Sequence, residues 1–456
     1  MVGSGSDRPP IRRPSYWKVL STRSFFPLWI GQLVSLSGDS IFAVAMVWLV
    51  LVSTESPFYV GLTLAVTYIP AVILGPVAGV YIDRFNRVGI LLVSNILQGI
   101  TVGILSILYL THLLSIVLLL AFLFLIYTGA QFVKPAVNAM IPSIITEKEN
   151  LAAANSLFSF SSYFNTLLSY ALGGVIIAIA GVALPITYDS FSFFFAAATL
   201  LFVSKHYGET REKPKQVAEG SAGDNDDEIG DVRADGSDQR STKGREGGKG
   251  NEKDLGFRKQ LIEGFRFISS NRILTEMIIF GILVNFFGTA IIALLSPYSK
   301  DWLHGNADTY GFILAAFSLG GIIASFAFGK ISVRNYAGKL LLLGVILAGL
   351  CLASMGLTTY FPAAVAIMLV YGFMIILANL PIQVLIQAKV PRELLGRVST
   401  ALVAVITATQ PFASVIAGTI ALSVTLGSIF VIFGASVVMI GVFSYIVFKE
   451  LRAATY

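Results

Sequence analysis

Three charged side chains lie inside stretches of the chain that are otherwise apolar. Asp39, Asp189 and Lys134 each stand within a run long enough to cross a bilayer. A charge at the bilayer centre costs about 2.5–3.5 kcal/mol on insertion scales, so each of these residues is a candidate for function. In surroundings of low dielectric a carboxyl group favours its neutral form and can bind and release a proton.

Asp39 lies near the middle of the first apolar run, beside Gly38 and about two helical turns after Gln32. We expect it to be a carboxylate that couples transport to protons or binds a cation inside a cavity. The alternative is a structural carboxylate that pairs with hydroxyl groups or with a helix end.

Asp189 and Lys134 each have two interpretations. Asp189 is either a second protonation or substrate site, or a group that caps or pins a helix near the outer surface. Lys134, nearer the cytoplasmic face, either neutralises a carboxylate on another helix or binds an anionic substrate. A lysine close to a helix end can also extend its ammonium group to the membrane interface.

Amide side chains within the apolar runs are further candidates for lining a substrate cavity, although such groups often only bond a neighbouring helix. The first half of the chain offers Gln32, Gln98, Gln131 and Asn138, and the second half offers Asn285, Asn379, Gln383 and Gln410. Because the charged candidates all lie in the first half, we expect that half to titrate while the other shapes the pocket.

The elements that must position these residues are membrane-spanning helices. The composition is 55% hydrophobic and only 13% charged, whereas charged residues make up about a quarter of soluble domains. Apolar runs occupy residues 25–51, 59–82, 89–110, 113–140, 151–180, 182–203, 273–295, 311–328, 340–357, 363–387, 398–424 and 429–447. The sequence therefore predicts an all-α membrane protein with 12 transmembrane helices in two six-helix, pseudo-symmetric halves.

The distribution of Lys and Arg predicts the orientation. These residues fall in alternate gaps between the runs, and the opposite set of gaps holds only Lys300. The positive-inside rule then predicts that both termini lie in the cytoplasm. We expect a multi-pass protein of the cell membrane.

We expect five segments. These are a cytoplasmic tail (1–23), a first six-helix bundle (24–204), a disordered cytoplasmic linker (205–256), an interfacial helix with the second bundle (257–448), and a short cytoplasmic tail (449–456). The linker is rich in glycine and mixed charge, and such a composition cannot bury enough surface to fold. The halves resemble a parallel repeat, in which Gly79 corresponds to Gly329 and Pro142 to Pro391.

Several motifs resemble those of the major facilitator superfamily, and among its members the proton-driven drug exporters that include macrolide efflux proteins. The loop Gly79–Arg87 (GVYIDRFNR) resembles the signature loop of the superfamily. The exporter-like stretches are SLSGDSIF (35–42), KPAVNAMIP (134–142), DSFSF (189–193), LIEGFRFI (261–268) and VPRELLGRVST (390–400). The sequence departs from the family pattern at Asn86 and Val88.

The resemblance implies that the signature loop is a gate. Gly79 allows close helix approach, and Asp83 can accept bonds from the positive N-terminal end of the eleventh helix. Arg84 and Arg87 can bind acidic partners such as Glu147, or lipid headgroups. The second candidate for a latch, Arg397, lies at the matching end of the eleventh helix.

The sequence predicts a transporter, not an enzyme. The three histidines share no metal-ligand spacing, no phosphate loop occurs, and we expect no cofactor. We expect export of an amphiphilic or drug-like compound by proton antiport, by a monomer whose partners are substrate, protons and membrane lipids, without nucleic acid. Two alternatives remain: a carrier of an anionic siderophore or lysolipid held by Lys134, and a non-transporting membrane receptor.

Overall fold

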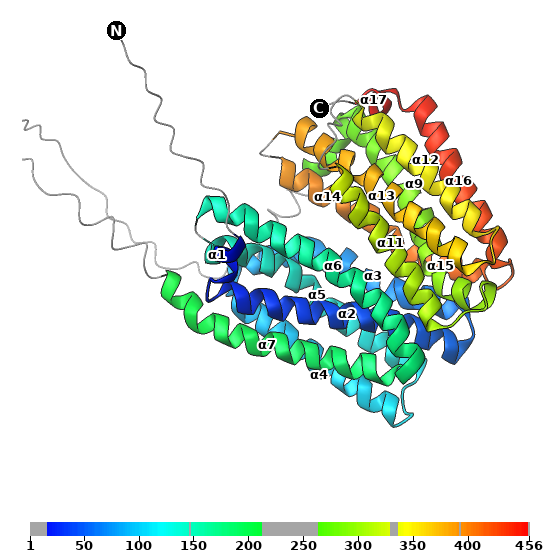
Figure 1. Ribbon diagram of the computed structural model, residues 1–456. Coiled ribbons are helices and arrows are strands. Elements are labelled where there is room, and N and C mark those ends of the chain that lie inside the picture. Colours follow the sequence, from blue (N-terminus) through cyan, green and yellow to red (C-terminus); the bar gives the residue numbers. More distant parts are fainter. Residues whose placement is uncertain (1–15, 146, 212–262, 329–335, 392–393, 455–456) are drawn as a thin grey trace, which may run out of the picture.

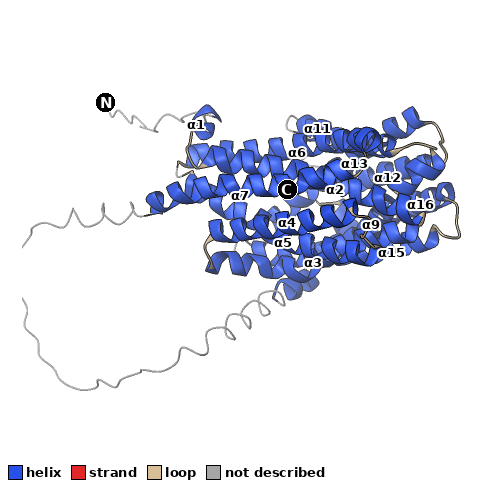
Figure 2. Cartoon of the chain, turned by 90° about the horizontal axis from the view of Figure 1, so that it is seen from below, coloured by secondary structure: helices blue, strands red, loops and turns tan. Residues whose placement is uncertain are grey.

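Helices make up all the regular structure in the described part of the chain. The computed structural model describes residues 16–145, 147–211, 263–328, 336–391 and 394–454, and Figure 2 draws only helices and loops over these residues. In an apolar membrane every backbone polar group needs a partner within the protein, and a helix supplies it locally.

The first half begins with a short helix and continues with six long ones (Figure 1). They are α1 (Tyr16–Leu20), α2 (Phe25–Thr54), α3 (Pro57–Arg84), α4 (Arg87–Leu110), α5 (Ile116–Ile144), α6 (Lys148–Ala180) and α7 (Ala183–Arg211). Local chemistry sets several of the boundaries. The Asn86 and Ser115 side chains accept bonds from the first turns of α4 and α5, and Gly181, at a φ of 75°, ends α6.

The second half repeats this order after a helical segment at 263–270. Its helices are α9 (Arg272–Ala293), α10 (Leu295–Pro297), a π-helical turn η1 (Tyr298–Trp302), α11 (Ala307–Phe328), α12 (Ala337–Met355), α13 (Phe361–Lys389), α14 (Leu395–Ala408), α15 (Gln410–Ile420), α16 (Leu426–Val447) and α17 (Lys449–Arg452). The offset from Phe25 to Arg272 equals that from Lys148 to Leu395, so the two halves run in the same register.

The prediction of twelve spans is confirmed, because twelve helices in the described residues are long and apolar enough to cross a membrane. Two details differ from the prediction. Helix α7 continues to Arg211, past the predicted start of the linker. The eleventh span is divided at Thr409, since Pro411 has no N–H group to continue the ladder. Residues 212–262, and with them most of the linker and part of the predicted interfacial helix, lie outside the described residues.

The two halves diverge from a common end (Figure 1). We call the end that carries α1 and α17 the terminal end and the opposite one the far end. At the far end one apolar cluster includes residues of both halves, such as Trp48 and Tyr310, whose rings stack 6.5 Å apart. At the terminal end each half has a separate cluster of its own. The halves are therefore joined at the far end and separate at the terminal end.

Glycines allow the backbones to meet at the far end. A Cβ on Gly174 of α6 would lie 2.9 Å from the Cα of Gly311 in α11, and one on Gly418 of α15 would lie 2.6 Å from the carbonyl oxygen of Pro57 in α3. Helix interfaces within membranes use small residues in this way, because packing replaces the hydrophobic driving force.

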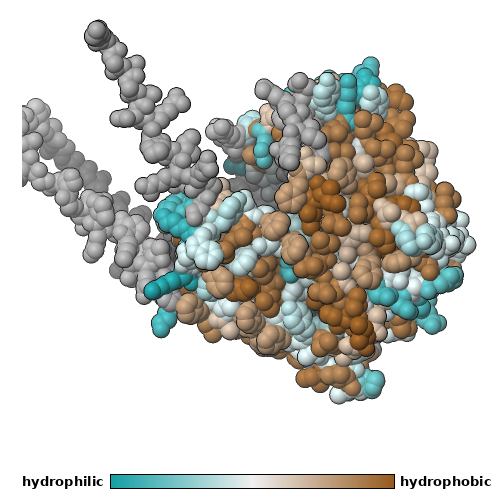
Figure 3. All heavy atoms as spheres, in the orientation of Figure 1, coloured by the Kyte–Doolittle hydropathy of each residue, from teal (hydrophilic) through white to brown (hydrophobic). Residues whose placement is uncertain are grey.

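The surface matches a protein that spans a bilayer. Hydrophobic side chains cover the sides of the helices in Figure 3, and hydrophilic ones gather near the helix ends. Many large apolar residues are exposed on this face and elsewhere, among them Ile107, Ile179 and Met439. An apolar surface of this extent is expected only where lipid or another protein covers it.

Candidate functional site

A polar cavity lies within the first half. It has a volume of about 430 Å³ and is walled by α2, α4, α5, α6 and α7. Five predicted site residues line it together: Gln32, Asp39, Gln98, Lys134 and Asn138. Lys134 and Asn138 are exposed and lie toward the terminal end of α5, whereas Gln98 is buried. The cavity thus places a carboxyl group, an ammonium group and three amides around one space.

Asp39 stands at the middle of α2, partly buried. The neighbouring Gly38 brings α7 close, because a Cβ there would lie 2.5 Å from Asp189 Oδ1 and 2.9 Å from the Cβ of Ser192. Only a residue without a side chain fits this position without a shift of α7. Gly38 therefore sets the spacing between the two acids.

Asp189 is fully buried on α7 behind Gly38. The hydroxyl of Ser192 donates to its Oδ1 at 3.4 Å, while Oδ2 has no hydrogen-bond partner among the described residues. The carboxyl groups of Asp39 and Asp189 interact electrostatically, and the Tyr127 hydroxyl interacts with both. Asp189 lies against the middle of α2 and not near the outer surface, and the choice between a titrating and a structural carboxyl group stays a prediction.

Lys134 lines the same cavity as Asp39. Among the described residues no carboxylate lies within ion-pair distance of its Nζ. One predicted role, the neutralisation of a carboxylate on another helix, is therefore not seen in this conformation. The cavity thus holds an ammonium group without an ion-pair partner among the described residues.

Gln131 differs from the other predicted amides. Its Nε2 donates to the Tyr127 carbonyl oxygen one turn earlier at 3.1 Å, and it does not line the polar cavity. Gln98 also bonds within its own helix, to Ser94 O at 3.1 Å, and packs against Gly129, where a Cβ would lie 3.0 Å from Gln98 Cγ.

A second cavity, of about 250 Å³, is lined mainly by the second half, with Tyr68 of α3 from the first half. Asn285, Asn379 and Gln410 line it together with Tyr68 and Tyr371. Gln410 reaches this cavity from the break between α14 and α15. The side chain of Gln383 lies outside the described residues. Three of the four predicted amides of this half therefore share a cavity in which none of the described lining residues is charged.

A third cavity, of about 360 Å³, lies between the halves and shares wall residues with each of the other two. Tyr163 and Thr166 of α6 line both this interface cavity and the polar cavity. Phe317 of α11 lines both the interface cavity and the cavity of the second half. The interface cavity therefore shares wall residues with the polar cavity on one side and with the second cavity on the other.

The predicted gating residues lie at the terminal end. Gly79, Asp83 and Arg84 belong to α3, but their side chains lie outside the described part of the structure. Arg87 donates from Nη1 to the carbonyl oxygen of Ala139 at 2.8 Å and to Ser143 Oγ at 3.0 Å. It thus joins α4 to α5, not to the predicted acidic partner Glu147.

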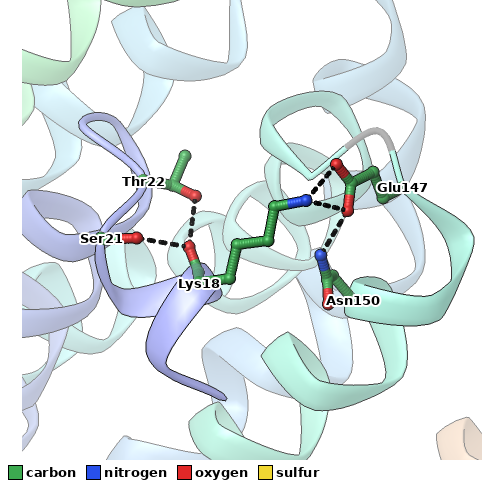
Figure 4. A network of polar contacts seen from close by, with 5 residues as sticks. All are labelled: Lys18, Ser21, Thr22, Glu147 and Asn150. Atoms are coloured by element: carbon green, nitrogen blue, oxygen red, sulfur yellow. Dashed lines mark hydrogen bonds and ion pairs between the residues drawn. The ribbon is translucent and has the colours of Figure 1, made fainter. Parts of the chain in front are cut away.

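Glu147 binds a different cation. Both of its carboxylate oxygens accept from Lys18 Nζ, at 2.6 and 2.8 Å, and Oε2 also accepts from Asn150 at 2.6 Å (Figure 4). In the second half Arg397 Nη1 donates to Glu263 Oε2 at 2.6 Å. Both ion pairs connect the segment before the first long helix of a half with the start of its fifth.

Sequence reasoning missed Tyr127 and Ser192 as neighbours of the acids. The spacing of residues in the sequence contains a signal for each of these two neighbours. Tyr127 stands two helical turns before Lys134 and so shares its face of α5, and Ser192 follows Asp189 by one turn.

The comparisons with known proteins agree with this architecture. A sequence model described as "Major Facilitator Superfamily" matches residues 28–409 and 278–455. Macrolide efflux protein A of Streptococcus pyogenes is 21% identical over 430 residues, 93% of this chain and 95% of that protein. The enterobactin exporter of Escherichia coli is 22% identical over 378 residues, 82% of this chain and 80% of that one. The crystal structure of a bacterial homologue of the iron transporter ferroportin, in an inward-facing state, superimposes with a TM-score of 0.67 at 15% identity and covers 94% of this chain and 98% of its own.

Proposed function

The chain belongs to the major facilitator superfamily and is a multi-pass membrane transporter, and from this premise we propose that it exports a small amphiphilic compound across the cytoplasmic membrane in exchange for protons. The observation that carries the proposal is the acid pair beside the polar cavity. Asp39 lines the cavity, and Asp189, with an unpartnered oxygen, lies behind Gly38. A buried carboxylate without partners is unfavourable as an ion, so a proton that comes and goes fits this place.

The separation of the halves at the terminal end supports alternating access. The Lys and Arg distribution supports a cytoplasmic position for this end, and with that orientation the conformation is open to the inside. Cargo enters the polar cavity from the cytoplasm, and rocking of the halves then opens the far end. A proton that enters from outside neutralises Asp39 and weakens its attraction for a cationic group, which leaves with the cargo.

The gate of this cycle is the terminal end itself. In the closed conformation Asp83 accepts bonds from the first turn of α14, with Gly79 at the helix contact and Arg84, Arg87 and Arg397 as the cations around it. In the present conformation Arg397 is held by Glu263 instead. Opening and closing then exchange one partner of Arg397 for another.

Uptake into inverted membrane vesicles tests the proposal. Erythromycin and a panel of amphiphilic cations serve as probes, with and without a protonophore. We expect Asp39→Asn to abolish accumulation that the protonophore can collapse, while the protein still reaches the membrane. The matched control is Asp301→Asn, the same chemical change at an exposed position outside the three cavities. Proton-driven accumulation that survives in Asp39→Asn removes Asp39 from the mechanism.

A second candidate cargo, an anionic amphiphile, is favoured by the unpaired Lys134 in the polar cavity. The similarity to the enterobactin exporter fits this cargo class. Lys134→Ala should then abolish export of a labelled lysophospholipid or catecholate, with Lys300→Ala in η1 as the control. If Lys134→Ala instead loses cation efflux and keeps anion flux, the anionic cargo is wrong.

A further inference from the structure

A polar pocket of about 390 Å³ lies at the terminal end of the second half. It lies between the start of α9 and the end of α16, which pack against each other. Its polar lining residues come from the segment 263–270 and the first turns of α9: Ser269, Ser270, Arg272, Thr275 and Glu276. Val447 and Phe448 form its apolar wall. We call this space the α9–α16 pocket, and none of its described lining residues belongs to the three cavities above.

The guanidinium group of Arg272 is held in place from one side only. Its Nε donates to Glu276 Oε1 at 3.3 Å, and Glu276 Oε2 accepts from the backbone N–H of Leu451 at 2.9 Å. The Glu276 side chain is 7% exposed and that of Arg272 is 73% exposed. Nη1 and Nη2 of Arg272 have no partner among the described residues. A buried carboxylate thus orients the guanidinium, and its two outer nitrogens can bind a phosphate group in a bidentate manner.

The hydroxyl groups in the pocket offer acceptors. Ser269, Ser270 and Thr275 each donate to a main-chain carbonyl oxygen, at 2.9–3.0 Å. Because a hydroxyl group has a single hydrogen, the lone pairs of these oxygens are what remains for a ligand. A phosphate group has no N–H or O–H to give them, whereas a primary ammonium group has three donors. With one basic and one acidic residue among its described lining residues, the pocket matches a zwitterion that carries phosphate and ammonium.

The surface beside the pocket matches hydrocarbon. Exposed apolar side chains follow pocket residues at four-residue spacing, which puts them on the same faces of the two helices and carries those faces toward the middle of the spans. They are Ile279 and Leu283 after Thr275 on α9, and Phe443 and Met439 before Val447 on α16. The pocket itself lies where both spans end, at the depth of the lipid head groups. A phospholipid has its polar and apolar parts in this order.

The first half shows that the fold does not require the polar residues of this pocket. In the register of the repeat, Phe25 and Trp29 stand at the positions of Arg272 and Glu276. Phe25 is fully buried, so apolar packing fills the corresponding place. Helix α7 is one uninterrupted helix of 29 residues, whereas α16 has 22 and the chain bends at Phe448 into α17. A buried acid and an exposed base at a place where aromatic residues also fit indicate a ligand.

We propose that the α9–α16 pocket binds the head group of phosphatidylethanolamine from the membrane leaflet at the terminal end. The phosphate group lies on Arg272, and the ammonium group donates to the hydroxyl oxygens of Ser269 and Ser270, near the carboxylate of Glu276. The acyl chains lie along the exposed apolar faces of α9 and α16. The lipid is a bound partner of the second half and not a cargo, because its site is separate from the three cavities.

Titration of the delipidated, full-length protein with lipids in detergent tests the proposal. Native mass spectrometry counts the bound lipids and gives the Kd of the first one. The probes are the dioleoyl forms of phosphatidylethanolamine, phosphatidylcholine, whose nitrogen has no N–H, and phosphatidylglycerol, which has no nitrogen. We expect the first phosphatidylethanolamine to bind about tenfold more tightly than either, the effect of one hydrogen bond to a charged group. Equal binding of phosphatidylcholine or phosphatidylglycerol overturns the proposal.

Variants assign the binding to this pocket. Arg272→Ala/Glu276→Gln removes both charges together, so no buried charge loses its partner, and the glutamine can still accept from Leu451. We expect it to weaken phosphatidylethanolamine binding about tenfold. Arg266→Ala is the matched control, because Arg266 is exposed on the preceding segment and does not line the pocket. An unchanged Kd in the double variant, or an equal loss in the control, places the lipid elsewhere and overturns the proposal.

A second variant reads the ammonium group alone. Ser269→Ala/Ser270→Ala removes two acceptors at exposed positions, where folding is little affected. It should bring the Kd values of phosphatidylethanolamine and phosphatidylcholine together and leave that of phosphatidylglycerol unchanged. A preference for phosphatidylethanolamine that survives in this variant refutes the assigned ammonium site.

The contribution of the acyl chains is measured by competition. Glycerophosphoethanolamine, the same head group without chains, should fail to displace phosphatidylethanolamine at equal concentration. If it displaces the lipid, the pocket binds a soluble phosphodiester and the lipid assignment is wrong. The assay involves no transport, so proton-driven export and lipid binding can each fail without the other.

Discussion

The two halves of the molecule share a frame and differ in chemistry. Phe286 stands as far from the start of α9 as Asp39 stands from the start of α2. The first half has a carboxyl group beside a polar cavity at this position, and the second has a phenyl ring packed edge to face on Phe287, 5.4 Å away. The repeat thus keeps helix lengths and register while the residues that face the centre diverge.

The acidic residue of α9, Glu276, has a structural role. Glu276 lies in the first turns of α9, bonded to Arg272 at 3.3 Å and accepting from the backbone N–H of Leu451 at 2.9 Å. Its carboxylate joins α9 to α17 and has partners for both oxygens. Asp189, by contrast, keeps an oxygen without a partner among the described residues. The comparison shows how a structural acid and a candidate titrating acid differ in the same fold.

The largest expected effect comes from moving the carboxyl group from position 39 in the first half to position 286 in the second half. Asp39→Asn should abolish proton-driven export, and adding Phe286→Asp should not restore it. An acid at position 286 lies among aromatic rings and lacks the neighbours Asp189 and Tyr127 that Asp39 has. Uptake into inverted vesicles measures both variants, and restored accumulation in the double variant means that the halves are interchangeable.

A smaller effect is expected from the contact that sets the spacing of the acid pair. Gly38→Ala should lower the free energy of unfolding by about 1–3 kcal/mol, because the added methyl group overlaps Asp189 and Ser192 on a packed helix. Gly288→Ala is the control in the second half, since its Cβ would meet only the Tyr371 hydroxyl, at 3.7 Å. Thermal unfolding of the purified proteins in detergent separates the two. Equal losses of stability would show that Gly38 is not a close contact.

Much of this site could be predicted from the sequence because a polar group within an apolar span stands out. Lys134 and Asp39 are predicted in this way, and the spacing of four residues between Lys134 and Asn138 puts both on one face of α5. The twelve spans follow from the same contrast between apolar runs and charged gaps.

The contacts between helices could not be predicted, because they depend on how the helices rotate and approach. The proximity of Asp39 and Asp189 depends on Gly38, and the interface cavity depends on which residues of α6, α11 and α13 face one another. Position along a span therefore misled the interpretation of Asp189. A count of turns placed it near the outer surface, whereas packing places it against the middle of α2.

The smallest predicted effects concern the two ion pairs at the terminal end. The acidic and the basic residue exchange places between the halves, and we call this an opposite polarity. In the first half the cation, Lys18, is on α1 and the acid, Glu147, is at the start of α6 (Figure 4). In the second half the acid, Glu263, is on the segment 263–270 and the cation, Arg397, is at the start of α14. That segment lies close to α14, because a Cβ on Gly264 would be 2.8 Å from the carbonyl oxygen of Arg397.

The two pairs should differ in strength because they differ in exposure. The side chains are 57% and 51% exposed in the Lys18–Glu147 pair, against 37% and 39% in the Arg397–Glu263 pair. Exposed ion pairs contribute about 0.2–1 kcal/mol and weaken with salt. We expect the coupling energy between Lys18 and Glu147 to lie at the low end of this range. The coupling energy between Arg397 and Glu263 should be larger than that between Lys18 and Glu147.

Double-mutant cycles on thermal stability measure these couplings at low and high salt. A single Glu147→Ala change also removes the bond from Asn150 at 2.6 Å, so only the cycle with Lys18→Ala isolates the ion pair. The charge-reversed variant Lys18→Glu/Glu147→Lys gives the first half the polarity of the second and should recover most of the coupling. If it recovers none, or if the more exposed pair proves the stronger, then packing of α1 and of 263–270 holds these segments in place, and the polarity difference between the halves has no energetic consequence.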